Sequence, residues 1–238
     1  MGWVQALAVI LIEIIRKSHY QKRKNNQKME TKNRKIGVIG AGNMGAQLGK
    51  LWSKAGYEVK FSSRNPKKLQ HLLHGLDNAS IGTIDETIDF ADVILLAINY
   101  GTIEQLIPKL RGKDKVIIDL TNPVVWTPEG KLKRANLNGL SAGEDLQKKL
   151  PEATVVKAFS SHYAASLEEG HRDYPIAVLF TTDNNEVRQL AEDMIKNAGF
   201  APLFYGGLNR SLDIELYGKY SNKIMSLEEA MTDVNQHP

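Results

Sequence analysis

The residues best suited to chemistry in this chain are three glycines at a spacing that binds phosphate. The loop Gly40-Ala41-Gly42-Asn43-Met44-Gly45 follows a short β-branched run and precedes a segment with helical spacing, which is the context that this motif requires. There Gly40 permits a tight turn, Gly42 lets a pyrophosphate approach the backbone, and Gly45 lets the helix lie close to the strand. The amides at the start of the helix and its dipole would then bind the anion. The loop therefore predicts a dinucleotide site.

A second cluster of polar residues lies where such sites choose their cofactor. NAD-specific sites place an acidic residue at the end of the second strand, about 20 residues after the glycines. Here the segment Ser62-Ser63-Arg64-Asn65-Pro66-Lys67-Lys68 has no acid and offers hydroxyls, a guanidinium and two ammonium groups. These groups suit a 2′-phosphate. We therefore predict NADP(H), with Ser62, Ser63, Arg64 and Lys68 in its site; the alternative is a solvated basic turn.

Candidates for acid-base or metal chemistry are weaker. His162 and Tyr163 follow the carboxyl end of an expected strand, where open α/β sheets bind ligands, but we favour a surface or packing role for them. His71 and His74 lie one helical turn apart without a third ligand in view, so we expect no metal. Because no Tyr-x-x-x-Lys arrangement or compelling His/Asp pair is present either, no catalytic acid is assigned.

These side chains require strands that end at one edge of a sheet. The best strands are two continuous apolar runs, residues 91–98 and 115–120, as expected of parallel strands buried on both faces. The pattern predicts an α/β fold of Rossmann type, a doubly wound, mainly parallel sheet in a single domain with a small C-terminal extension. Further strands are expected at 35–39, 57–62, 79–81, 155–159, 176–181 and 201–205, and helices at 46–55, 67–73, 186–198, 212–223 and 226–233.

Composition agrees with an ordinary globular protein. Of 238 residues, 42% are hydrophobic and 24% charged, which excludes a disordered chain. The absence of cysteine excludes disulfides, thiolate metal sites and a cysteine nucleophile. The net charge of +4 comes largely from basic residues crowded into the first 35 positions. Because only Tyr20 interleaves with them, we do not expect nucleic acid binding.

The N-terminal segment 1–34 is expected to lie outside the fold, ahead of a cofactor domain at 35–208 and a short helical tail at 209–238. Residues 3–15 are apolar except for Gln5 and Glu13, but they fall short of the roughly 20 residues that span a bilayer. Their charges follow the apolar run instead of preceding it, unlike a secretory signal. An interfacial membrane anchor, a helix that docks on a partner and an extension irrelevant to the fold remain open, with the last favoured. We expect a cytoplasmic protein.

Several segments occur together in the order of one known family. They are Ile36-Gly37-Val38-Ile39 with the glycine loop, Ser63-Arg64-Asn65-Pro66, Asp119-Leu120-Thr121-Asn122-Pro123, Ser141-Ala142-Gly143-Glu144-Asp145-Leu146-Gln147, and Leu150-Pro151 followed by Val155-Val156-Lys157-Ala158-Phe159. From Lys35 to about Leu208 the chain thus resembles the NADP oxidoreductases typified by coenzyme F420-dependent NADP reductases, whose fold recurs in the cytoplasmic domain of STEAP metalloreductases.

The resemblance implies roles for particular residues. Ser63 and Arg64 would hold the 2′-phosphate, residues Ala97, Ile98 and Asn99 would pass beneath the cofactor, and Asn122 and Pro123 would lie near the nicotinamide. Ala158 joins the cofactor site on the same ground. The chain departs from the family after Lys157-Ala158-Phe159, where asparagine and threonine are usual and Ser160-Ser161-His162-Tyr163 stands here. The six membrane helices of a full metalloreductase have no counterpart, so metal or haem reduction would need a separate partner.

We therefore expect an NADP(H)-dependent enzyme that transfers a hydride between NADPH and a flavin- or deazaflavin-like acceptor, F420 or a flavin serving as co-substrate. Such a transfer needs alignment and water exclusion more than an acid. The alternatives are a non-catalytic NADP(H) sensor or redox-partner domain, and a reductase of a small imine or carbonyl substrate. The short C-terminal end leaves pocket closure to a homodimer mate or to the strands from Val155 onward.

Overall fold

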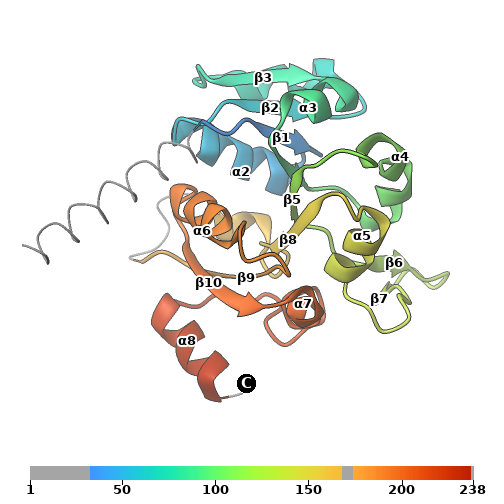
Figure 1. Cartoon of the computed structure of the whole chain (residues 1–238), viewed down its shortest axis with the longest axis vertical. Helices are drawn as coiled ribbons and strands as arrows, with labels where there is room; N and C mark the ends of the chain where they lie inside the picture. Colours follow the sequence, from blue (N-terminus) through green and yellow to red (C-terminus); the bar gives the residue numbers. More distant parts are fainter. Residues whose placement is uncertain (1–32, 168–173, 237–238) are drawn as a thin grey trace, which may run out of the picture. The chain divides into compact units, whose positions relative to one another are not determined.

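The structure, a computed structural model, describes residues 33–167 and 174–236. The segment considered as an anchor, residues 3–15, lies outside them. Figure 1 shows a twisted sheet with helices on both faces. Its strand order is β10-β9-β8-β5-β4-β1-β2-β3, and every neighbouring pair is parallel except β8 with β9. The strands are β1 (Ile36–Ile39), β2 (Val59–Ser62), β3 (Ala79–Gly82), β4 (Val93–Leu96), β5 (Val116–Asp119), β8 (Thr154–Ala158), β9 (Ala177–Thr181) and β10 (Ala201–Gly206).

The Rossmann-type, mainly parallel fold predicted from the sequence is confirmed. Each expected strand is present within two residues of its predicted ends. The helical elements are α2 (Asn43–Lys54), η1 (Pro66–Leu73), α3 (Ile84–Phe90), η2 (Tyr100–Gln105), α4 (Ile107–Leu110), α5 (Ala142–Lys149), η3 (Ala164–Leu167), α6 (Arg188–Asn197), η4 (Leu208–Arg210), α7 (Ser211–Ile214) and α8 (Leu227–Gln236).

Alternate residues of the central strands supply two separate cores, one on each face of the sheet. Val38 and Leu95 join α2 and α6 in one core, and their neighbours Ile39 and Leu96 join α3, α4 and α5 in the other. The continuous apolar runs of the sequence follow directly, because both faces of these strands are buried. On the first face the Trp52 indole of α2 also donates to the Met194 carbonyl of α6 at 2.9 Å.

The expected helix over residues 212–223 is wrong. Only α7 forms, and the chain then turns back, with the Tyr220 amide donating to the Asp213 carbonyl at 2.8 Å. Gly218 permits this turn, since a Cβ there would clash with the carbonyl oxygen of Leu212. Ile214 and Tyr220 of this segment are buried while Leu212 and Tyr217 are exposed, so the helical spacing of its apolar residues does not correspond to one buried helix face. The next expected helix, 226–233, is present as α8.

Two features that position the site were not predicted. The first is α3, which crosses from β3 to β4. The second is an antiparallel hairpin, β6 (Val124–Trp126) and β7 (Leu132–Arg134), which follows the carboxyl end of β5. In Figure 1 this hairpin lies beside α5 and projects from the end of the sheet. The described residues contain no helix long and apolar enough to cross a membrane.

Candidate cofactor site

The glycine loop joins β1 to α2 in a conformation that only glycine tolerates at two of its three positions. Gly40 has φ +97°, and a Cβ there would meet the carbonyl oxygen of Ala97. A Cβ on Gly45 would meet the carbonyl oxygen of Gly40, so the helix packs directly on the loop. Gly42 differs, because a Cβ there would have nothing within 4 Å. Its open side is the place where a ligand can reach the backbone.

The amino terminus of α2 is also left without a cap from the protein. Its N-cap is Gly42, no side chain caps it, and its first turn contains no acidic residue. By contrast α3 and α5 begin with complete capping boxes, Thr83 with Glu86 and Ser141 with Glu144. The positive end of the α2 dipole is therefore not neutralised by a carboxylate from its own first turn. An anion can take that place.

A cavity of about 310 Å³ runs along this loop and brings together seven of the predicted site residues. They are Gly40, Gly42, Ser63, Arg64, Ala97, Ile98 and Asn99. The carboxyl ends of β2, β1 and β4 meet there, as the topology of an open parallel sheet requires. Asn43, Met44 and Gly45 continue the loop into α2 beyond the cavity wall.

The end of β2 divides into residues that shape the loop and residues that face the cavity. Ser62 is fully buried; its hydroxyl donates to the Val38 carbonyl at 3.0 Å, and its own carbonyl accepts from the amides of Gly40 and Ala41. Ser63 and Arg64 line the cavity, and the Arg64 side chain is exposed. Lys68 is exposed on η1 and lies outside the cavity wall.

The wall also contains residues that the sequence reasoning missed. Thr102 and Gln105 come from η2, Leu106 follows it, and Ile84 opens α3. The Thr102 hydroxyl donates to the Asn99 carbonyl at 2.7 Å and so fixes the turn after β4. The hydroxyl of Thr102, three residues after Asn99, was the one local sequence signal that could have predicted a residue of this wall. No sequence pattern identifies Ile84 or Leu106 as wall residues.

Asn122, Pro123 and Ala158 do not line this cavity. The Asn122 amide nitrogen donates to the Ser160 carbonyl at 2.9 Å, and its oxygen accepts from the Leu216 amide at 2.7 Å. Pro123 is buried at the start of the hairpin, and Ala158 is buried in β8. Asn122 therefore ties three segments together at the carboxyl end of β5.

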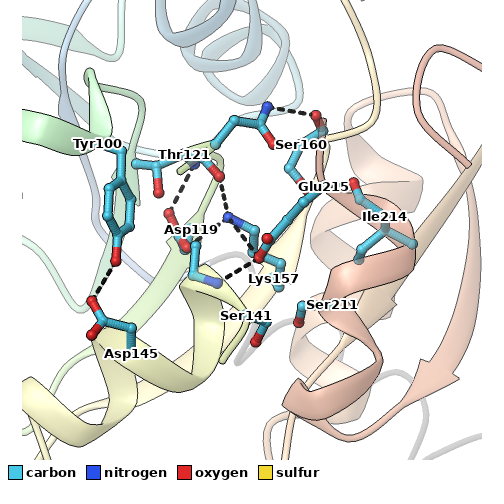
Figure 2. Close-up of polar contacts among 12 residues, drawn as sticks. Tyr100, Asp119, Thr121, Ser141, Asp145, Lys157, Ser160, Ser211, Ile214 and Glu215 are labelled. Atoms are coloured by element: carbon cyan, nitrogen blue, oxygen red, sulfur yellow. Dashed lines mark hydrogen bonds and ion pairs between the residues drawn. The ribbon is translucent and has the colours of Figure 1, made fainter. Parts of the chain in front are cut away.

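Next to Asn122 lies a buried cluster of charged side chains, drawn in Figure 2. Lys157 from β8, Asp119 from β5 and Glu215 after α7 are all fully buried. Lys157 Nζ lies 2.8 Å from Asp119 Oδ2 and 4.0 Å from Glu215 Oε1, and it donates to the Thr121 carbonyl. The Thr121 amide donates back to Asp119 Oδ1 at 2.8 Å. The backbone amide and carbonyl of Thr121, the residue before Asn122, are thus both hydrogen-bonded to buried charged side chains.

Glu215 connects this cluster to the hairpin. Its Oε2 lies 2.7 Å from Arg134 NH1, and its Oε1 accepts from the Ala142 amide at 2.7 Å. Two acids and two bases balance one another, which is how buried charges are retained at tolerable cost. None of these residues was predicted to be a site residue, although Asp119 and Lys157 lie within the segments that carry the family resemblance.

The nearby Tyr100 hydroxyl donates to Asp145 Oδ2 on α5 (Figure 2). Burial, followed by this hydrogen bond, raises the pKa of the Tyr100 phenol well above its usual value. The phenol is therefore neutral over the ordinary pH range and fastens η2, which lines the cavity, to α5.

His162 and His71 do not line the cofactor cavity. His162 is buried, with Nδ1 3.1 Å from the Ser161 hydroxyl, and Tyr163 is exposed. His71 is exposed, with Nδ1 3.0 Å from the Lys68 carbonyl oxygen. Across the described ranges, no group of three or more His, Cys, Asp or Glu side chains is placed to hold a metal ion.

Part of the chain matches a known protein family. Residues 35–123 match the model of the family described as NADP oxidoreductase, coenzyme F420-dependent. Metalloreductase STEAP3 of Rattus norvegicus is 30% identical over 184 residues, which cover 76% of this chain and 36% of that protein. The chain thus spans about a third of the length of the curated relatives that it matches.

Solved structures share the fold at low sequence identity. A hypothetical protein from Sinorhizobium meliloti has a TM-score of 0.73 at 21% identity, covering 81% of this chain and 95% of its own. A reductive aminase from Aspergillus terreus, solved with NADPH, has a TM-score of 0.58 at 16% identity, covering 86% of this chain and 63% of its own.

The strand order and the shared fold define a Rossmann-type domain, and the helix behind its glycine loop begins without a cap. Over residues 35–123 the chain is similar to the NADP oxidoreductase, coenzyme F420-dependent family. The resemblance inferred from the sequence motifs is confirmed.

Proposed function

We propose that this protein binds NADPH along the cavity at the carboxyl ends of β1, β2 and β4 and transfers a hydride to a flavin- or deazaflavin-like acceptor. The observation that supports this most directly is the pairing of the open Gly42 backbone with an α2 amino terminus that carries no cap. Pyrophosphate supplies the negative charge that this end of the helix lacks.

The opposite end of the cavity fits the 2′-phosphate. Ser63 and Arg64 reach the wall from the end of β2, and none of the described residues that line the cavity is acidic. An exposed guanidinium can pair bidentately with a phosphate. Ala97 to Asn99 form the floor between these two anion sites, which fits the body of a dinucleotide.

The remaining wall favours hydride transfer without acid catalysis. Arg64 is the one titratable side chain among the described residues that line the cavity. NADPH held in this cavity would supply a hydride to a conjugated acceptor ring, and the accompanying proton would come from water. The protein then contributes orientation, by Thr102 and Asn99, and exclusion of water, by Ile84, Ile98 and Leu106. Reduction of an imine or ketone would instead require a proton donor beside the ring.

The test is an acceptor panel. Purified protein is mixed with NADPH and with riboflavin, FMN, a 5-deazaflavin, a ferric chelate or a cyclic imine, and the nicotinamide absorbance is followed. We expect faster oxidation with the flavin or deazaflavin and no reaction with the imine. Tight NADPH binding without turnover by any acceptor would contradict the enzyme and favour a sensor, and turnover of the imine alone would reassign the substrate.

A further inference from the structure

The β6–β7 hairpin presents large apolar side chains to solvent on one face. Trp126 is 68% exposed and Leu132 is 39% exposed, and these two residues face each other across the two strands. Tyr217, 58% exposed, joins them by donating its hydroxyl to the Leu132 carbonyl at 3.1 Å. We call Trp126, Leu132 and Tyr217 the aromatic platform. An exposed apolar group of this kind commonly marks a binding surface.

The platform is held in place by buried interactions. A two-stranded hairpin is only marginally stable by itself. Arg134 shares the face of Trp126 and Leu132, because residues alternate along a strand, and its guanidinium pairs with the fully buried Glu215 at 2.7 Å. Tyr217 follows Glu215 by two residues and adopts a positive φ of 72°, a strained conformation for a tyrosine. The Arg134–Glu215 ion pair therefore helps to hold the exposed side chains of the platform in place.

The hairpin that carries the platform follows the strand next to the cofactor cavity. Along the edge of the sheet the order of strands is β2, β1, β4 and β5, so the hairpin that follows β5 comes next after the cavity. Strand β6 also packs beside η2, whose residues Thr102 and Gln105 line the cavity. With the phosphates at the ends of β2 and β1, a nicotinamide would lie toward β4 and β5, and its partner ring would approach from the hairpin.

The charges on the hairpin indicate which chemical class of ligand the platform suits. Lys133 pairs with Val125 and so projects from the opposite face of the hairpin. On the platform face of these two strands, the charge of Arg134 is neutralised by Glu215. An uncharged surface of indole, leucine and phenol suits a flat conjugated ring better than an acidic peptide or a phosphate.

We propose that the aromatic platform of Trp126, Leu132 and Tyr217 binds the planar ring of the hydride acceptor, with the Arg134–Glu215 ion pair holding it in position. The proposal rests on the function proposed above and names the surface that would receive the acceptor.

Riboflavin is the probe, because it presents the ring without a phosphate. Its binding is measured by quenching of its emission, and its reduction by NADPH gives KM and kcat. We expect Trp126→Ala and Tyr217→Ala each to raise the dissociation constant and KM for riboflavin by about three- to tenfold. NADPH affinity should stay within about twofold, and Trp126→Phe should recover most of the loss. Met231→Ala, which removes a 47% exposed side chain from α8, is the matched control.

Unchanged riboflavin affinity and KM in both alanine variants would overturn the proposal. So would a change in molecular mass, by light scattering, in Trp126→Ala with the riboflavin kinetics intact, since the platform would then be a face for a second copy. Riboflavin binding that depends on Trp126 but is never followed by NADPH oxidation would support the platform and contradict the proposed enzyme.

Discussion

Lys157 Nζ lies 2.8 Å from Asp119 Oδ2, and both side chains are fully buried at the carboxyl ends of two adjacent strands (Figure 2). Together they bind the carbonyl and the amide of Thr121, so the chain that leaves the sheet toward Asn122 and the hairpin takes one path. A buried ion pair is weak evidence of net stability, but removal of one partner leaves the other charge unpaired.

Breaking this pair should therefore be costly. We expect Lys157→Met to lower the free energy of unfolding by about 3–5 kcal/mol, because the Asp119 carboxylate would lose its buried partner. Denaturant titration measures the loss, and Lys157→Met/Asp119→Leu should be milder than the sum of the single changes. Lys109→Met is the control, since its pair with Asp85 is exposed and should contribute at most about 1 kcal/mol. Equal losses at the two lysines would contradict the argument.

Substitutions of two glycines in the loop should affect protein stability and NADPH affinity differently. Gly42 has φ −79° and free space for a Cβ, so Gly42→Ala should leave the fold as stable as before while weakening NADPH by at least about tenfold. Gly45→Ala should lower the melting temperature as well, because its methyl group would strike the Gly40 carbonyl. Thermal melts and NADPH fluorescence titrations of both variants test this; a Gly42→Ala protein that binds NADPH normally would rule out the loop as the phosphate site.

Arg64 should decide between the two nicotinamide cofactors. We expect Arg64→Ala to weaken NADPH by about 10- to 100-fold and NADH by less than about threefold, because only NADPH carries the phosphate that a guanidinium would pair with. Arg111→Ala, which removes another exposed arginine that does not line the cavity, should change neither. The measurement is the dissociation constant of each cofactor, and equal losses for both would refute the assignment of the 2′-phosphate.

Tyr205 in β10 should make the free energy of unfolding fall at alkaline pH. Burial raises the pKa of Tyr205 from 10.0 to about 12; a hydrogen bond from Arg210 opposes this shift, and the bond to Asp213 adds to it. Because the folded pKa lies above the unfolded one, the contribution is complete below pH 10 and is lost as the pH rises through 12. Over that window the wild-type unfolding free energy should fall more steeply than that of Tyr205→Phe. Parallel curves would contradict this role of Tyr205.

Much of the cofactor half of the site could be read from the sequence because its physics is local. A strand, three glycines and a helix start within a few residues of one another, and the loop can bind phosphate through its own backbone. Ser63 and Arg64 follow in a register set by the length of one helix and one strand. Helical spacing failed at residues 212–223, where Gly218 and long-range hydrogen bonds overrode the pattern.

The sequence by itself thus determined the fold class, and it located the glycine loop and the residues at the end of β2 that we propose bind the cofactor. Only the tertiary structure decided that Ser62 supports the loop from within, that Asn122 ties segments together, and that Lys157, Asp119 and Glu215 meet in one buried cluster. These contacts join residues separated by 24 to 94 positions. No local pattern encodes such pairings, because they exist only once the strands have been placed side by side.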